Sequence, residues 1–359
     1  MPLSRSSRET DLAALFQRHG FALSDVPVLQ PAEPFIELSG EDIRRRLYLV
    51  GDAAGEDLCL RPEFTIPAAR AYLASGLAEP RDFAFIGPVF RQRPDRTGEF
   101  VQASLESYGR ADIAAADADM LALAIEAEST LGAERHAIRI GDVGLTAALI
   151  AALDISPAIA RKLRQNGLAQ TAAMPAGDGN GLAAYRGVLA ALKGADPAEA
   201  RAFVKDLLSI AGLKTVGGRT PAEIADRFLE KAEDTGVGLS SEQATILARF
   251  RAVAGDPDAV SAEVRALADA ARLDLAAALD RFDTRTGFIA AKGIDLARLE
   301  ASTAFARNLD YYTGFVFEFV AATGDKPSIA GGRYDGLLRR LGATTPVPAV
   351  GCALWLERF

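Results

Sequence analysis

Strand-favouring sequence lies near both ends of this chain, and a long helix-favouring stretch separates the two parts. Asp82–Val89 and Val101–Tyr108 have the residue types of strands and are mixed with helix-favouring segments in the first third of the chain. From about Gly144 to Phe288 the sequence is rich in alanine and charged residues, which favour helices. Alternating Val and Phe residues return at Gly314–Val320. This order predicts an α+β core that is interrupted by a helical insertion.

The expected domain boundaries follow this change in composition. Residues 1–143 form the first part of the core, residues 144–288 the helical insertion, and residues 289–359 the second part of the core. A chain of 359 residues with 49% hydrophobic residues can bury a core of this size. The most apolar stretch, Val143–Leu153, is far shorter than the roughly 20 residues needed to cross a bilayer. We therefore expect a buried helix there and no membrane partner.

Charge and the scarcity of cysteine and histidine exclude several classes of function. A formal net charge of −8 and a pI near 5.1 disfavour a nucleic-acid partner. Cys59 and Cys352 are too far apart in the sequence to indicate a disulfide framework or a zinc site, and His19 and His136 are the only histidines. The first residues, up to Asp11, lack the apolar run of a secretion signal. We expect a cytoplasmic protein without a metal or a cofactor.

The densest group of reactive side chains precedes the predicted strand at Gly314–Val320. Arg307, Asp310, Tyr311 and Tyr312 combine a fixed cation, a carboxylate and phenolic hydroxyls, as expected at the edge of a binding pocket. Taken alone, the run fits equally well a turn capped by Arg307 and Asp310, with both tyrosines packed in the core.

A second segment, Ala330–Leu337, has two adjacent glycines followed by polar residues. Such glycines permit a tight turn or the close approach of the backbone to a ligand. In their order and separation, the two segments resemble the two histidine-specific motifs of the histidyl-tRNA synthetase family. The resemblance implies that Arg307, Tyr311, Tyr312 and Tyr334 bind histidine.

The segment Leu60–Thr65 also resembles a part of the synthetase pocket. In the family, the matching loop holds the amino group of the amino acid, and the resemblance assigns that role here to Glu63 and Thr65. A buried carboxylate opposite an ammonium group suits the task. The simpler interpretation is a turn before a helix that begins near Pro67.

Phe90–Gly109 resembles motif 2 of class II synthetases, a strand, a loop and a strand. If its loop is shorter than in the family, Gln102 and Glu106 match two pocket residues, and Arg91 matches the arginine that binds the α-phosphate. Gln102, Ser104 and Glu106 then lie on one face of a strand, because side chains alternate. A solvated charge on an edge strand is the alternative interpretation of Glu106.

Two more motifs extend the resemblance over nearly the whole predicted core. Gly20–Leu29 resembles motif 1, which makes a dimer interface in the family, and Gly351–Arg358 resembles motif 3. The implied fold is a class II aminoacyl-tRNA synthetase-like core, α+β, with an antiparallel sheet flanked by helices. Self-association as a dimer is also implied. The helical insertion matches no motif, and its role stays open.

The predicted nucleotide site departs from the family pattern. The cations needed for adenylation, Arg91, Arg307 and Arg358, stand at matching positions. However, Trp355 stands where motif 3 has a glycine, and the glutamate that reads adenine is absent after Arg91. We expect Arg91, Trp355 and Arg358 to form a vestigial ATP site that excludes adenine. An indole turned into the core instead would remove the steric part of this expectation.

The sequence reaches Phe359 directly after motif 3, where a synthetase continues into an anticodon-binding domain, so we expect no such domain. This combination resembles the family of regulatory subunits of ATP phosphoribosyltransferase. The resemblance implies a non-catalytic subunit that assembles with a short-form catalytic subunit, acts in the first step of histidine biosynthesis and mediates feedback inhibition by histidine. One alternative is an active histidine-activating enzyme, either a minimal synthetase or an amino-acid ligase. The other is a structural partner with a vestigial pocket.

Overall fold

A computed structural model describes residues 6–39, 43–51, 55–76, 79–94, 96–132, 136–156, 159–160, 163, 202, 239–306, 311–321 and 326–359. The chain divides into two compact units. Unit 1 comprises Met1–Ala152 and Arg249–Phe359, and unit 2 comprises Leu153–Ala248. Unit 1 therefore includes the part of the predicted insertion that follows residue 248.

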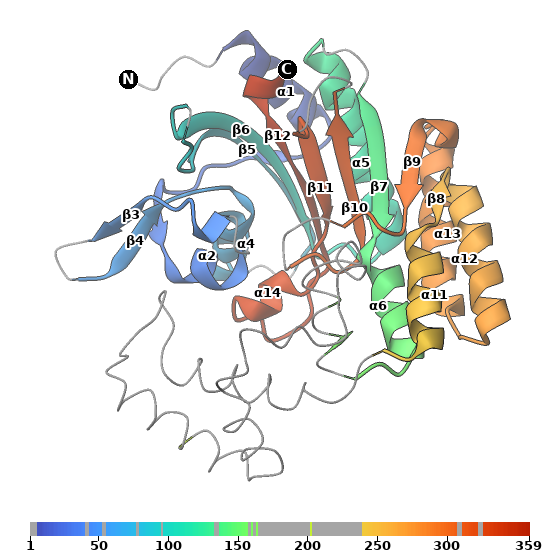
Figure 1. Cartoon of the computed structure of the whole chain (residues 1–359). Coiled ribbons are helices and arrows are strands. Elements are labelled where there is room, and N and C mark those ends of the chain that lie inside the picture. The colour runs from blue at the N-terminus through green and yellow to red at the C-terminus, as the bar shows by residue number, and fades with distance from the viewer. Residues whose placement is uncertain are drawn as a thin grey trace. The chain divides into compact units, whose positions relative to one another are not determined.

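A nine-stranded sheet forms the centre of unit 1 in the described ranges, in the order β1-β5-β6-β12-β11-β10-β7-β9-β8 (Figure 1). In that order the strands are β1 (Ala22–Leu23), β5 (Arg81–Phe90), β6 (Glu99–Tyr108), β12 (Ala349–Trp355), β11 (Ile329–Arg333), β10 (Phe315–Val320), β7 (Ala137–Asp142), β9 (Leu299–Ser302) and β8 (Ala254–Gly255). The pairs β1–β5 and β7–β9 are parallel and the others antiparallel. β6 pairs with β12, so the two ends of the sequence build one sheet, as the split α+β pattern predicts.

Helices cover both faces of this sheet. The first face carries α1 (Ser7–Arg18) and α5 (Ile113–Thr130), and α13 (Ala276–Ala291) packs on α5 (Figure 1). The other face carries α4 (Thr65–Ala74) and the short α14 (Leu337–Arg340). Further helices within the described ranges are α2 (Glu33–Leu38), α6 (Val143–Ala152), α11 (Ser241–Arg251), α12 (Pro257–Ala271), η3 (Leu296–Arg298) and η4 (Leu356–Arg358).

Local sequence explains where several of these elements begin. The Ser6 side chain caps α1 by accepting a hydrogen bond from the Glu9 amide, and Asp256 caps α12 in the same way through Ala259. The predicted buried helix at Val143–Leu153 is confirmed as α6. Strand β8 falls inside the stretch predicted to be helical, where only two residues pair with β9. Among the described residues, no helix is long and apolar enough to span a membrane.

A small antiparallel sheet precedes α4, with β2 (Leu29–Pro31), β4 (Asp57–Leu60) and β3 (Leu49–Gly51) in the order β2-β4-β3. The loop that follows β4 is tied to the main sheet by Arg61. Its Nε donates to the Pro88 carbonyl of β5 at 3.0 Å, and its amide donates to the Val28 carbonyl at 2.8 Å. This fixes the start of α4 over the main sheet.

Most of the predicted insertion lies outside the described residues. Within unit 2, Ser240 and Gln243 cap each other at the start of α11: the Gln243 amide donates to the Ser240 hydroxyl at 3.1 Å, and the Ser240 amide donates to the Gln243 side chain at 2.9 Å. The Gln243 side-chain amide also donates to the Leu153 carbonyl at 3.0 Å.

Candidate functional site

The floor of the site is a set of small residues on β11 and β12. In the strand register, Gly351 lies opposite Glu106 on one side and Gly332 on the other, while Ala353 lies opposite Ser104. Opposed residues share a face of the sheet. A side chain at Gly351 would collide with the Glu106 carboxylate and the backbone of β6. The glycine is therefore required for the carboxylate to lie flat against β12.

Above this floor lies a cavity of about 280 Å³. Six of its lining residues are those predicted to bind histidine: Glu63, Thr65, Gln102, Tyr311, Tyr312 and Tyr334. Arg91 and Trp355 line it as well. Arg307 lies outside the described residues, and Glu106 and Arg358 do not line the cavity.

Glu63 is held at the first turn of α4. One carboxylate oxygen accepts the Thr65 amide at 2.5 Å, and the other accepts the Ile66 amide at 3.0 Å. Burial raises the pKa of Glu63, and the amides and the nearby Arg91 oppose that rise. Arg91 itself is oriented by a 2.8 Å hydrogen bond from its Nε to the Pro62 carbonyl. A carboxyl group and a guanidinium group thus both line the cavity.

Glu106 lies behind the cavity wall and is 1% exposed. Its carboxylate accepts hydrogen bonds from the hydroxyls of Thr65 (2.8 Å), Ser104 (2.7 Å) and Tyr334. Burial raises the pKa of Glu106 to about 8, against the lowering effect of these hydrogen bonds. Since Thr65 and Tyr334 line the cavity, Glu106 fixes the side chains of two residues in its wall.

Three tyrosines form an aromatic wall. The Tyr311 ring lies 5.1 Å from that of Tyr312 and meets that of Tyr334 edge-on at 5.7 Å, between ring centroids. Tyr334 also meets Tyr108 edge-on at 6.5 Å. Burial holds the pKa of Tyr334 well above its usual value, so its hydroxyl stays protonated and donates to Glu106. The wall offers aromatic faces to a ligand beside the polar end at Glu63.

The motif 3 segment occupies the opposite margin of the cavity. The Trp355 indole lines the cavity, and the Arg358 guanidinium lies over it, 4.4 Å from the ring centroid. Arg358 also donates to the Pro327 carbonyl. Arg93 pairs with Glu357 at 2.8 Å and lies 3.7 Å from the Phe100 ring centroid. Arg358 and Arg93 are therefore engaged by the protein's own groups, and Trp355 both lines the cavity and belongs to the hydrophobic core.

Comparisons with known proteins show which family the chain belongs to. The sequence profile of the histidyl-tRNA synthetase family matches residues 4–211 and 228–359. An ATP phosphoribosyltransferase regulatory subunit from Mesorhizobium japonicum is 38% identical over 355 residues, which cover 97% of this chain and 95% of that protein. One from Brucella canis is 37% identical over 347 residues, 94% and 92% of the two chains. The chain belongs to the ATP phosphoribosyltransferase regulatory subunit family. This confirms the prediction of a regulatory subunit.

Solved structures of similar proteins have the same fold. A Bacillus halodurans protein described as an ATP phosphoribosyltransferase regulatory subunit/histidyl-tRNA synthetase superposes with a TM-score of 0.70, at 21% identity, over 98% of this chain and 76% of its own. The histidyl-tRNA synthetase of Nostoc gives a TM-score of 0.65 at 18% identity, over 100% and 74% of the two chains. The predicted class II synthetase-like α+β fold is confirmed.

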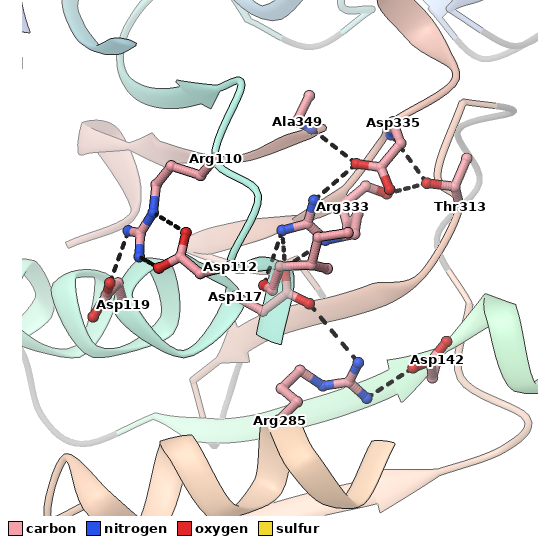
Figure 2. Close-up of polar contacts among 11 residues, drawn as sticks. Arg110, Asp112, Asp117, Asp119, Asp142, Arg285, Thr313, Arg333, Asp335 and Ala349 are labelled. Atoms are coloured by element: carbon pink, nitrogen blue, oxygen red, sulfur yellow. Dashed lines mark hydrogen bonds and ion pairs between the residues drawn. The ribbon is translucent and has the colours of Figure 1, made fainter. Parts of the chain in front are cut away.

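The structure of this family member also contains site-related residues that sequence reasoning missed. Glu318 and Cys352 line the cavity. The buried Arg333 contacts both the buried Asp117 of α5 and the partly exposed Asp335 (Figure 2). Arg333 and Asp335 flank Tyr334 within the glycine-rich segment, and this position next to a predicted binding residue could have indicated them. Among the described residues, no group of His, Cys, Asp and Glu side chains is arranged to hold a metal ion.

Proposed function

We propose that the cavity binds histidine, and that this regulatory subunit uses that binding to inhibit ATP phosphoribosyltransferase. The chain assembles with the short-form catalytic subunit and is required with it for the first step of histidine biosynthesis. The observation that carries the proposal is the convergence of Glu63, Thr65, Gln102 and the three tyrosines on one cavity. These residues come from four separate segments of the sequence.

The chemistry of the cavity suits each part of histidine. The ammonium group is bound at Glu63 and the Thr65 hydroxyl, and the carboxylate is bound by Arg91 and the Gln102 amide, with Arg307 in the role that its motif implies. The imidazole lies against the tyrosine wall, where Tyr312 and Tyr334 provide ring faces and hydroxyls. Glu106 holds the Tyr334 hydroxyl in place.

Titration calorimetry with histidine tests this proposal. We expect saturable binding by the wild-type protein and binding weakened roughly tenfold or more in Glu63→Gln, because a charge-assisted contact to the ammonium group is lost. Histidine should also inhibit the assembled complex with the catalytic subunit. Absence of binding would instead support a structural partner with a vestigial pocket.

A second candidate, a histidine-activating enzyme, is favoured by Arg91, which lines the cavity as a phosphate-binding arginine would. Trp355 opposes it, because a bulky indole lines the cavity where the family's motif 3 has a glycine. Histidine-dependent pyrophosphate exchange with ATP and magnesium separates the two. We expect no exchange, and clear turnover would rule out the regulatory proposal.

Self-association as a dimer is also part of the proposal. Val28 and Leu29, which belong to or adjoin β2, and Leu49 and Val50 of β3 expose large apolar side chains on the small sheet. Val28 and Leu29 end the segment that resembles motif 1. Both cysteines, Cys59 and Cys352, are buried and unpaired, in keeping with the cytoplasmic location that we propose.

A further inference from the structure

A cluster of buried charges lies on the face of the sheet opposite the cavity. Arg333 of β11 is 4% exposed and Asp117 of α5 is 1% exposed. The Arg333 Nε and one terminal nitrogen lie 2.8 and 2.7 Å from the same Asp117 oxygen. Arg285 of α13 lies 2.8 Å from Asp142, at the end of β7, and 3.8 Å from the other Asp117 oxygen (Figure 2). The cluster therefore joins β11 to two helices.

The same cluster holds together the two segments that carry the tyrosine wall. Arg333 donates to Asp335 at 2.8 Å, and that Asp335 oxygen also accepts the Ala349 amide at 2.8 Å. The Thr313 hydroxyl accepts the Asp335 amide at 3.0 Å, and the Thr313 amide donates to the Arg333 carbonyl at 2.8 Å (Figure 2). Thr313 follows Tyr312, and Arg333 precedes Tyr334.

Arg333 and Tyr334 point to opposite faces of the sheet. Tyr334 donates to Glu106 on the cavity face, whereas Arg333 meets Asp117 on the face covered by α5. Any shift of this short stretch of backbone moves both side chains. The position of the Tyr334 ring in the cavity is thus linked to the contact between Arg333 and α5.

The buried Arg333–Asp117 ion pair is not by itself a strong source of stability. Burying a guanidinium and a carboxylate costs several kcal/mol of desolvation per ion in general, and a well-packed apolar pair is often as stable. Burial raises the pKa of Asp117, against the lowering effect of Arg333 and Arg285. The charged pair fixes the orientation of the Arg333 side chain, because the planar guanidinium group binds a carboxylate in a defined geometry. An apolar pair does not provide this.

We propose that Arg333 and Asp117 are positioning residues for histidine binding, and that they set the tyrosine wall through Tyr334 and the Asp335–Thr313 contact. Neither residue lines the cavity. Arg285 connects Asp117 to α13 through the ion pair described above. Histidine binding and the seating of these helices are then energetically coupled, and each favours the other. This inference rests on the proposed function.

The test compares three variants of the full chain by histidine calorimetry and by urea unfolding. Asp117→Asn removes the charge that holds Arg333. Thr313→Val removes only a hydroxyl at an exposed residue that does not line the cavity, so the fold should persist. The control is Glu128→Gln, also buried on α5, which removes the carboxylate beside His136 (2.6 Å); neither residue lines the cavity.

We expect Asp117→Asn and Thr313→Val to raise the Kd for histidine roughly 3- to 30-fold, the range typical of energetic coupling between sites. Glu128→Gln should lower the stability to urea yet leave that Kd within about twofold of wild type. If wild type binds and both test variants bind as tightly as the control, the positioning role is wrong while the proposed function stands. If wild type does not bind histidine, the proposed function fails and this inference fails with it.

Discussion

At the scale of single residues, Glu106 is the group whose charge state should depend most clearly on the fold. Burial raises its pKa from 4.5 to about 8. The folded state thus keeps a proton that the unfolded state releases above pH 4.5. Protonated Glu106 therefore contributes fully to the free energy of unfolding below pH 4.5. This contribution is lost as the pH rises to about 8, at up to about 1.4 kcal/mol per pH unit.

Glu106→Gln tests this dependence, because the amide keeps the size of the side chain but cannot ionise. We expect the free energy of unfolding, measured by urea titration between pH 5 and 8, to fall less steeply with pH in the variant than in wild type. Parallel pH profiles for the two proteins would show that Glu106 is already ionised at pH 5 in the folded state.

The sequence predicts which residues come together where they belong to a motif of known position in the fold. Glu63, Thr65 and Tyr334 line one cavity as the motif resemblance implies. The position of Glu106 behind the wall could not be foreseen, because a motif does not give the depth of a side chain. The contact between Arg333 and Asp117 could not be predicted either, because the two residues lie 216 positions apart in the sequence and no local pattern connects them.

At the scale of elements, the close packing of β6, β12 and β11 depends on glycine. We expect Gly351→Ala to lower the free energy of unfolding by about 1–3 kcal/mol and to weaken histidine binding, because the new methyl group displaces the Glu106 carboxylate. Gly287→Ala is the matched control within α13, where a methyl group meets nothing within 4 Å. It should stabilise the protein by up to about 1 kcal/mol. Equal stability of the two variants in urea would contradict the packing argument.

Long elements with a strong pattern could be predicted from the sequence, and short ones could not. The strands predicted at Asp82–Val89 and Val101–Tyr108 appear as β5 and β6, each with two more residues. Two-residue β8 has no periodicity to detect and forms because β9 offers an edge. The parallel pairing of β7 with β9 likewise depends on tertiary contacts across the sequence gap between them.

At the scale of the whole molecule, unit 1 requires both ends of the chain. β12 inserts between β6 and β11, so the first part of the core has no complete sheet until the last residues join it. The composition shift predicts an insertion from residue 144 to residue 288, and the two compact units divide after Ala152 and after Ala248. Helices α12 and α13 have the composition of the insertion but pack in the core, and amino-acid composition does not report packing partners.

Self-association through the small sheet gives a prediction at this scale. Leu49 of β3 is 63% exposed, so covering this side chain with a partner subunit would favour the dimer. In a two-fold interface each substitution occurs twice, and Leu49→Asp should weaken the dimer by on the order of 3 kcal/mol, or roughly a hundredfold in Kd. Phe288→Asp is the control, because Phe288 is a 42% exposed apolar residue on α13, in a different part of unit 1. Sedimentation velocity at micromolar concentration should show a dimer for wild type and Phe288→Asp and a lighter species for Leu49→Asp. A dimer that dissociates only in Phe288→Asp would place the interface on α13 instead.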